Sequence, residues 1–315
     1  MMRAILRTGL VAALLLGAAC AGVGTSRPMV VDGGDRPVRI EARTTPLGPV
    51  GADLAPGVTY ARGLTLRGAD LHGLSDLKVV GDSAWAVSDF GALVHFRLML
   101  DEDGRLVGAE DAKSRPLVGP DGAPLMPKAR ADAEGLALLS DGTVLISFER
   151  DHRIWSYGPE GGDRPVSVTH PAVAFPDNGG MEGLAAGGTD GWLVLGEAGG
   201  GWTCRPGGCS ALTTYPAIGA DGFSLTGADR DPAGGWFVVE RFFKAPLDMR
   251  ARVRRLAADG TPGPTLIELR PPASVDNMEG IAAVATPTGT RLYLLSDDND
   301  NPLQRTLLLA FDVAL

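Results

Sequence analysis

The chain has 315 residues, of which 44% are hydrophobic, 6% aromatic and 21% charged, and it contains 44 Gly and 23 Pro. This composition supports a large folded core and is typical of short strands joined by turns rather than of a disordered chain. The formal net charge of −9 argues against nucleic acid as a partner, because phosphate binding requires clustered Lys and Arg.

Residues 1–19 have the pattern of an export signal. Basic residues precede an apolar run from Leu10 to Leu16, which is too short for a lasting membrane span, and small residues follow it. Cys20 stands where a lipoprotein signal places its lipid-modified cysteine, with ordinary signal cleavage nearby as the alternative. In both cases we expect an exported protein, either periplasmic or lipid-anchored, in which residues 20–57 form a linker with a candidate first strand.

Three closely related motifs recur further along the chain: "DAEGLAL" at 132–138, "GMEGLAA" at 180–186 and "NMEGIAA" at 277–283. Glu134 and Glu182 are 48 residues apart, and Glu182 and Glu279 are 97 residues apart, about twice that distance. A fixed period of this length is the signature of a repeat architecture, and the double interval predicts a degenerate copy halfway along it.

Two weaker copies complete the series. "LTGADRDPAGGWFVVERF" at 225–242 fills the halfway position, and "GLSDLKVVGDSAWAVSDFG" at 73–91 precedes the first strong copy. The copies consist of short apolar runs separated by Asp, Gly and Pro turns, and helical periodicity is nearly absent. Units of roughly 45–50 residues with up to four strands are typical of propeller blades. The sequence therefore predicts an all-β fold, a β-propeller over residues 58–315.

Five repeats are visible, so five blades are the first choice, and six remain open if residues 30–68 build most of another blade. The last repeat contains three strands, and an unassigned strand-like run, "VTYARGLTLRG" at 58–68, precedes the first repeat. We expect this N-terminal strand to complete the last blade, because pairing it there would close the ring and remove exposed strand edges.

Two cysteines lie close together in "WTCRPGGCS". Cys204 and Cys209 flank a Pro-Gly-Gly turn, and no further Cys or His stands nearby to complete a metal site. In an oxidising compartment this spacing predicts a disulfide at the tip of a hairpin.

Acidic residues recur at both ends of the predicted hairpins. The start of the innermost strand of a blade and the end of its second strand lie on one face, so we expect these acids to gather around the mouth of the central channel. Their mutual repulsion would be relieved by a hard divalent cation, with Ca²⁺ the first choice, or by Arg150 and Arg241. The predicted metal ligands are Asp89, Glu134, Glu182, Glu197, Glu240, Glu279, Asp297 and Asn299. The alternative for each acid is structural, since Asp and Asn commonly cap turns.

The same face provides candidates for catalysis. Glu149, Arg150, Glu182 and Arg241 are the predicted catalytic residues, and Arg150, Arg241 and His152 are the predicted substrate-binding residues. An exposed turn is the alternative position for His152. No G-x-S-x-G elbow and no H-E-x-x-H spacing occurs in the chain, which argues against a serine hydrolase of that type and against a zinc hydrolase.

The order "GLSDL…AVSDFG", "EGLAL…ISFERDHRI", "MEGLA" and "NMEGIAA…LYLLSDDN" resembles the phytase-like family described as having esterase-like activity of phytase. The resemblance covers roughly residues 58–313 and implies an exported bacterial protein that hydrolyses esters or phosphoesters. The positions that match the family pattern are Asp89, Glu134, Glu149, Arg150, Glu182, Glu240, Arg241, Glu279, Asp297 and Asn299. The fourth copy departs from the pattern, because "TGADR" stands where "EGL" is expected.

We therefore expect an exported propeller hydrolase that acts on a small ester or phosphoester with the help of a divalent cation. Two alternatives remain open: a non-catalytic propeller lipoprotein that binds a ligand or partner on its acidic face, and a metal-dependent lactonase-like propeller. We expect a monomer that contacts a membrane only through an N-terminal lipid anchor.

Overall fold

The computed structural model describes residues 34–162, 164–188, 191–215, 221–245 and 248–314. The predicted signal segment 1–19 and the candidate lipidation site Cys20 lie outside the described residues. Among the described residues, no helix is both long enough and apolar enough to cross a membrane.

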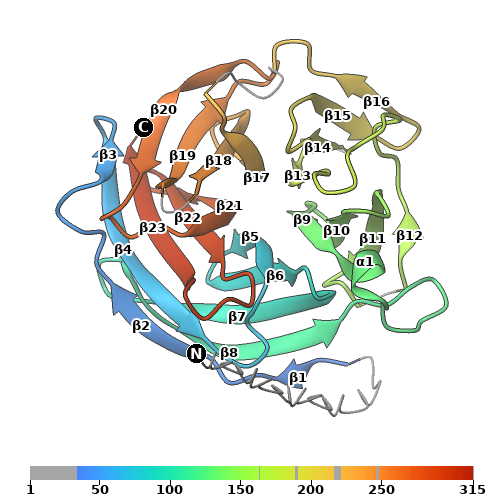
Figure 1. The fold of residues 1–315 in the computed structure, drawn as a ribbon, viewed down its shortest axis with the longest axis horizontal. Helices are drawn as coiled ribbons and strands as arrows, with labels where there is room; N and C mark the ends of the chain where they lie inside the picture. Colours follow the sequence, from blue (N-terminus) through green and yellow to red (C-terminus); the bar gives the residue numbers. More distant parts are fainter. Residues whose placement is uncertain (1–33, 163, 189–190, 216–220, 246–247, 315) are drawn as a thin grey trace, which may run out of the picture. The chain divides into compact units, whose positions relative to one another are not determined.

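Five antiparallel sheets stand around a common axis and form the blades of a β-propeller (Figure 1). The first blade contains β5 (Leu74–Val80), β6 (Ser83–Ser88), β7 (Ala92–Leu100), β8 (Leu106–Pro116) and, at its outer edge, β1 (Arg36–Pro37). The second contains β9 (Ala133–Leu138), β10 (Thr143–Phe148), β11 (Arg153–Pro159) and β12 (Val166–Ser167), and the short helix α1 (Lys128–Ala131) precedes it. The third contains β13 (Gly183–Ala186), β14 (Trp192–Leu195), β15 (Gly201–Arg205) and β16 (Gly208–Ala211).

The fourth and fifth blades each include a strand from the N-terminal part of the chain. The fourth contains β17 (Ser224–Arg230), β18 (Trp236–Lys244), β19 (Asp248–Leu256), β20 (Pro262–Leu269) and β3 (Ala52–Leu54). The fifth contains β21 (Asn277–Thr286), β22 (Gly289–Asp297), β23 (Thr306–Ala314), β4 (Val58–Arg67) and β2 (Glu41–Thr45). The innermost strands β5, β9, β13, β17 and β21 each contact the next, and β21 contacts β5, so the ring is closed.

Strand β4 completes the last blade, as predicted. It pairs antiparallel with β23 from Val58 opposite Val313 to Leu66 opposite Thr306. The prediction of five blades is confirmed, and the six-blade alternative is wrong, because residues 36–54 form no blade of their own. They add the short strands β1, β3 and β2 to the outer edges of three blades, where each covers an otherwise unpaired strand.

The core lies between the blades, as expected when each sheet is apolar on both faces. Leu77 and Phe96 of the first blade pack with Leu295 of the fifth, and all three are completely buried. Phe237 of the fourth blade packs in the same way against Ile281 of the fifth. In the third blade a disulfide joins Cys204 and Cys209, which face each other across β15 and β16.

The glycine of the repeated "EGL" motif lies where neighbouring inner strands approach most closely. A methyl group at Gly135 would lie 2.8 Å from the carbonyl oxygen of Glu182 and 2.8 Å from Cβ of Leu184, both in the next blade. A methyl group at Gly280 would lie 2.8 Å from the backbone nitrogen of Leu77. The repeat therefore requires glycine because the backbones of adjacent blades leave no room for a side chain.

Gly135→Ala is expected to destabilise the protein by about 2 kcal/mol, since overpacking against a rigid backbone costs roughly 1–3 kcal/mol. Gly208→Ala is the matched control, because a methyl group there meets no atom within 4 Å. Urea unfolding of both variants measures the difference. Equal stability of the two variants would contradict the close approach of the blades at Gly135.

Candidate functional site

A cavity of about 300 Å³ lies where the inner strands begin and the second strands end. Every blade contributes to its wall, and we call it the mouth cavity. Its lining residues are Ser75, Asp89, Lys128, Asp132, Glu134, Glu149, Arg150, Asn178, Glu182, Glu197, Arg241, Glu279, Asp297 and Asn299.

In three blades an equivalent backbone hydrogen bond holds the acid that follows the second strand. The N–H of Asp89 donates to the carbonyl of Gly73 at 2.9 Å, and that of Glu149 donates to the carbonyl of Asp132 at 2.8 Å. The N–H of Glu197 donates to the carbonyl of Gly180 at 3.0 Å. Each bond ties the end of a second strand to the segment just before the inner strand, so both sets of acids open onto the same cavity.

The structure brings ten of the predicted site residues together. They share one cavity wall: Asp89, Glu134, Glu149, Arg150, Glu182, Glu197, Arg241, Glu279, Asp297 and Asn299. This is a statement of position, and their roles remain predictions.

Glu240 does not lie with them. Strand β18 continues to Lys244, so side-chain alternation persists through its end, and Arg241 faces the mouth cavity while Glu240 faces away. Glu240 instead pairs with Arg252 at 2.6 Å and with Arg254 at 2.5 Å, both on the next strand. The expectation that Glu240 joins the acids of the mouth is therefore wrong, and we do not propose it as a metal ligand.

His152 lies beside the mouth cavity but does not line it. Its Nε2 is 2.9 Å from the carbonyl oxygen of Pro176, and its ring packs on Phe175 with centroids 5.4 Å apart. These contacts account for one ring nitrogen and one ring face, so the structure offers no direct support for the predicted substrate contact.

Asp132 is the main site residue that the sequence analysis missed. One carboxylate oxygen from each of Asp132, Glu134 and Glu149 lies within 4.8 Å of the others. The available signal was the first letter of "DAEGLAL", but Gly180 and Asn277 stand at the corresponding position of the other strong copies. A search for repeated acids therefore passes over an acid that occurs in one copy only.

The inner strands of the two weaker copies carry Asp76 and Asp229, which do not line the mouth cavity. Asp76 is fully buried, and its Oδ2 accepts hydrogen bonds from Lys78 Nζ at 2.7 Å and from the N–H of Leu136 in the next blade at 2.8 Å. Asp229 likewise accepts from the N–H of Ala283 in the fifth blade at 2.8 Å. These carboxylates link adjacent blades and therefore have a structural role.

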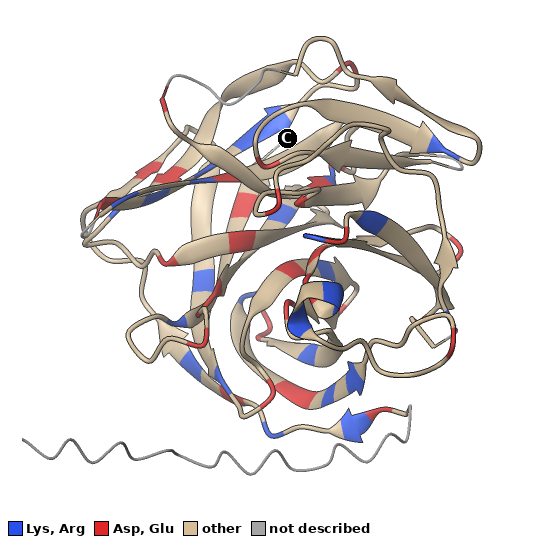
Figure 2. Cartoon of the chain, turned by 45° about the vertical axis from the view of Figure 1, so that its right-hand side comes forward, with Lys and Arg blue, Asp and Glu red and all other residues tan. Residues whose placement is uncertain are grey.

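Three cationic side chains partly balance the acids of the mouth cavity. Figure 2 shows acidic and basic segments close together around the short helix. Lys128, the first residue of α1, lies 2.5 Å from Asp89 and 3.1 Å from Asp132. Arg150 lies 2.6 Å from Asp132. Arg241 lies 2.8 Å from Glu279 and also contacts Asn277. Eight carboxyl groups line the same wall, so these cations leave an excess of negative charge.

Four buried acids of the mouth cavity have raised pKa values. Burial, followed by repulsion from neighbouring carboxylates, raises the pKa of Glu134 and of Glu182 well above the ordinary value for Glu. Burial raises the pKa of Glu279 to about 8, although Arg241 opposes the shift. Burial also raises the pKa of Asp297 to about 7. The cavity therefore favours binding of protons or of another cation.

The donor atoms of the mouth cavity fit a hard divalent cation. Asp89 Oδ1 and Glu279 Oε2 are buried and have no hydrogen-bond donor among the described residues. Buried polar atoms are normally satisfied, so orphaned carboxylate oxygens beside the Asp132, Glu134 and Glu149 cluster point to a missing positive partner. Oxygen ligands alone suit Ca²⁺ or Mg²⁺ rather than softer metals.

Arg150 has an unusual backbone conformation for its residue type. It follows directly after Glu149 with φ of 60°, in the left-handed region that favours glycine. A non-glycine residue there costs on the order of 1 kcal/mol and is often retained for its side chain. The side chain of Arg150 is 45% exposed and lines the mouth cavity, where it can meet an incoming anion.

Comparisons with known proteins bear on the fold and on the family. No curated protein matches the chain. Solved structures with similar folds include the allergen Mala s 1 of Malassezia sympodialis, at 13% identity and a TM-score of 0.45, over 80% of this chain and 86% of that one. Virginiamycin B lyase from Staphylococcus aureus has 11% identity and a TM-score of 0.42, over 87% and 99% of the two chains. A gluconolactonase from Xanthomonas campestris has 14% identity and a TM-score of 0.40, over 85% and 99%.

These similarities are too low to indicate a shared function. The family model is more informative, because it matches a continuous segment that includes every residue lining the mouth cavity, from Ser75 to Asn299. Residues 69–300 match the model described as "Phytase-like: Esterase-like activity of phytase", which is most of the chain, and the chain therefore belongs to the phytase-like family.

Proposed function

We propose that this chain hydrolyses an ester or phosphoester bond at the mouth cavity with the help of a divalent cation, with Ca²⁺ as the first candidate. The observation that carries the proposal is the convergence of acids from several blades on one cavity, with the compact cluster Asp132, Glu134 and Glu149 at its wall. The family description, which names esterase-like activity, supports the same reaction class.

The cluster of Asp132, Glu134 and Glu149 would hold the cation. The remaining acids of the wall complete the oxygen-rich surroundings, and the orphaned oxygens of Asp89 and Glu279 lie among them. A cation bound there would supply electrostatic polarisation of the ester or phosphoryl oxygen.

Arg150 and Arg241 would bind the anionic oxygens of the substrate. Arg150 is the more accessible of the two, because its side chain is 45% exposed, against 25% for Arg241. Planar guanidinium groups can bind two oxygens of a phosphate or carboxylate at once. We expect Arg150 to contribute mainly to substrate capture, and Arg241 to orient the substrate and the neighbouring acids.

Glu182 would donate the proton to the leaving oxygen. It is buried in the wall of the mouth cavity, just before β13, and none of the described side chains forms an ion pair with it. A carboxyl group in surroundings that favour its protonated form is suited to general acid catalysis.

The proposal is tested by the hydrolysis of 4-nitrophenyl acetate and 4-nitrophenyl phosphate, before and after the protein is stripped on an immobilised chelating resin. We expect turnover of at least one substrate, loss of turnover on stripping, and recovery with Ca²⁺ or Mg²⁺. On an alkyl ester or alkyl phosphate, whose poor leaving group must be protonated, Glu182→Gln is expected to lower kcat by about 100-fold or more, as general acid catalysis is typically worth roughly 10²–10⁴-fold. Arg150→Gln is expected to raise KM more than it lowers kcat.

The exposed Glu102→Gln is the matched control, since Glu102 lies outside the mouth cavity. Turnover that survives both stripping and Glu182→Gln would reject this mechanism. No turnover of either substrate, together with saturable ligand binding that depends on Arg150, would favour the non-catalytic binding propeller instead. We also propose that the protein is exported, on the basis of the signal pattern in residues 1–19.

A further inference from the structure

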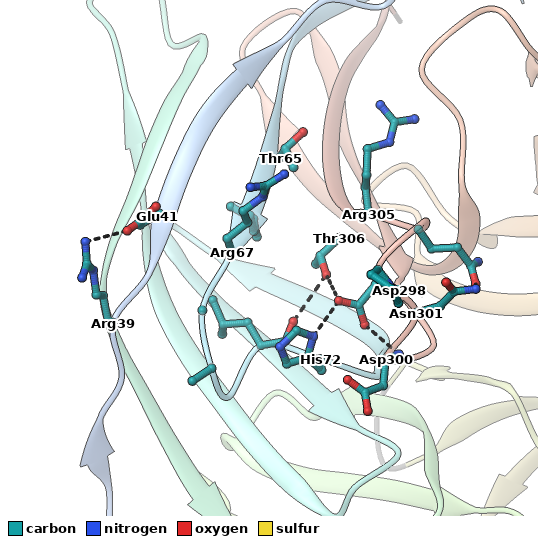
Figure 3. A pocket seen from close by; sticks show the side chains of 16 residues that line it. Arg39, Glu41, Thr65, Arg67, His72, Asp298, Asp300, Asn301, Arg305 and Thr306 are labelled. Carbon is teal, nitrogen blue, oxygen red and sulfur yellow. Dashed lines mark hydrogen bonds and ion pairs between the residues drawn. The ribbon is translucent and has the colours of Figure 1, made fainter. Parts of the chain in front are cut away.

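A second and larger cavity, of about 660 Å³, lies outside the mouth cavity, and we call it the side cleft. Its walls come from β2, β4, the segment between β4 and β5, and the segment between β22 and β23 (Figure 3). The volume lies within the range of roughly 300–1,000 Å³ found for small-molecule sites.

The two cavities share one loop but use different side chains of it. Asp297 and Asn299 line the mouth cavity, whereas Asp298 and Asp300 line the side cleft. The side cleft is therefore a separate site with its own set of polar groups.

Two arginines line the side cleft from neighbouring strands. Arg67 is the last residue of β4, and Arg305 directly precedes Thr306 of β23, which pairs with Leu66 of β4. Figure 3 shows the two side chains on opposite sides of Thr65, with His72 and Asp298 below them. Two guanidinium groups in one cavity favour an anionic ligand.

The carboxylates nearby do not supply that anion. Glu41, the neighbour of Arg67 on β2, forms its ion pair with Arg39 at 2.6 Å. Among the described residues, no carboxylate oxygen lies within 4 Å of the Arg67 guanidinium group. Arg305 lies 3.4 Å from Asp276 and remains 42% exposed.

Both carboxylate oxygens of Asp298 also have partners within the protein. Its Oδ2 lies 2.8 Å from His72 Nδ1, and its Oδ1 accepts hydrogen bonds from the N–H groups of Gly73 and Asp300, each at 3.2 Å. The acids of the side cleft other than Asp300 are thus held by local donors, while Arg67 has its donors free for a ligand.

We propose that the side cleft is a second binding site that takes a small organic anion, whose carboxylate or phosphate group is bound by Arg67 and Arg305. The two guanidinium groups provide a forked set of donors that matches either group, and His72 lines the wall beside them. The ligand binds independently of the cation at the mouth cavity, because none of the mouth acids lines the side cleft.

Isothermal titration calorimetry with citrate and, separately, with inorganic phosphate tests the proposal. The protein is stripped beforehand on an immobilised chelating resin, because soluble chelators are themselves polycarboxylates and would compete. We expect one equivalent of at least one probe to bind. Citrate alone would indicate a carboxylate ligand, and phosphate alone would indicate a phosphate ligand.

Arg67→Gln and Arg305→Gln are each expected to weaken this binding by roughly 10- to 100-fold, the effect of losing a charge-assisted hydrogen bond. Arg205→Gln, an exposed arginine of the third blade, and Arg150→Gln in the mouth cavity are expected to leave binding at the side cleft unchanged. Melting curves confirm that the variants are folded.

Three results would overturn the proposal: no binding of either probe at millimolar concentration, undiminished binding by Arg67→Gln, or loss of binding in Arg150→Gln. The last would place the probe in the mouth cavity. Since no step of the experiment requires turnover or a cation, its outcome is independent of whether the chain is a hydrolase.

Discussion

Adding Ca²⁺ or Mg²⁺ to metal-free protein is expected to raise the free energy of unfolding by about 4 kcal/mol when the free cation is at a thousand times its dissociation constant. The reason is the excess of carboxyl groups over Lys128, Arg150 and Arg241 in the mouth cavity. The folded chain gathers these acids, and the unfolded chain separates them, so a cation that binds the cluster stabilises the folded state alone. Differential scanning calorimetry at several cation concentrations measures the effect.

Asp132→Asn and Glu149→Gln identify where the cation binds. Each change removes one charged ligand of the compact cluster and preserves its shape, so each is expected to abolish most of the cation-dependent gain. Glu102→Gln, which changes the net charge equally but at an exposed position, is the control and should retain the full gain. A full gain in Asp132→Asn and Glu149→Gln would show that the cation binds elsewhere.

The metal-free protein is expected to lose stability as the pH rises from 5 to 8, by at least about 2 kcal/mol, since one unit of pKa shift corresponds to about 1.4 kcal/mol. Burial raises the pKa of Glu279 to about 8 and that of Asp297 to about 7, and it raises the pKa of Glu134 and Glu182 in the same direction. The folded state therefore binds more protons than the unfolded chain, whose acids titrate near pH 4. The stabilisation that comes from the protonated acids is complete below the pKa values of the unfolded chain. It is lost as the pH rises through the higher pKa values of the folded state.

Urea unfolding of resin-stripped protein at pH 5, 6, 7 and 8 measures this slope. Glu182→Gln is expected to flatten it and to stabilise the metal-free protein at pH 8, because it removes one buried negative charge from the group. Saturating cation should reverse the sign of the slope, since the ligands must lose their protons to bind it. Stability that rises from pH 5 to 8 without cation would contradict these shifts.

The sequence predicts the propeller well because the intervals between the repeated motifs reveal the length of one blade. The repeated Glu134, Glu182 and Glu279 fix the period, and the period fixes which strand ends share a face. The missing fourth strand of the last repeat likewise predicts that β4 pairs with β23. Both inferences need only the chain order and the rule that strand edges are paired.

The site was less predictable wherever local geometry departs from the average repeat. Glu240 and Glu149 occupy similar places in the sequence, but β18 continues past its acid, whereas β10 ends at Phe148. A turn therefore carries Glu149 into the mouth cavity, while strand alternation carries Glu240 away from it. Asp132 shows the opposite case, because it belongs to one repeat only and becomes important through its approach to Glu134 and Glu149.

The side cleft could not be predicted, because it depends on pairing between distant segments. Arg67 and Arg305 are separated by most of the sequence, and they line the same cavity only because β4 pairs with β23. A charge pattern read along the chain contains no sign of such a pair.

The pairing of β4 with β23 also has a consequence for biosynthesis. A nascent chain that has already produced the first four blades still lacks residues 306–314, so β4 can pair only with β2 and the fifth blade cannot be completed. The ring can close only after β23 has left the ribosome, and until then unpaired edges are available for wrong contacts with other chains. Interrupted translation products of this protein should therefore be far more prone to aggregate than the full-length chain.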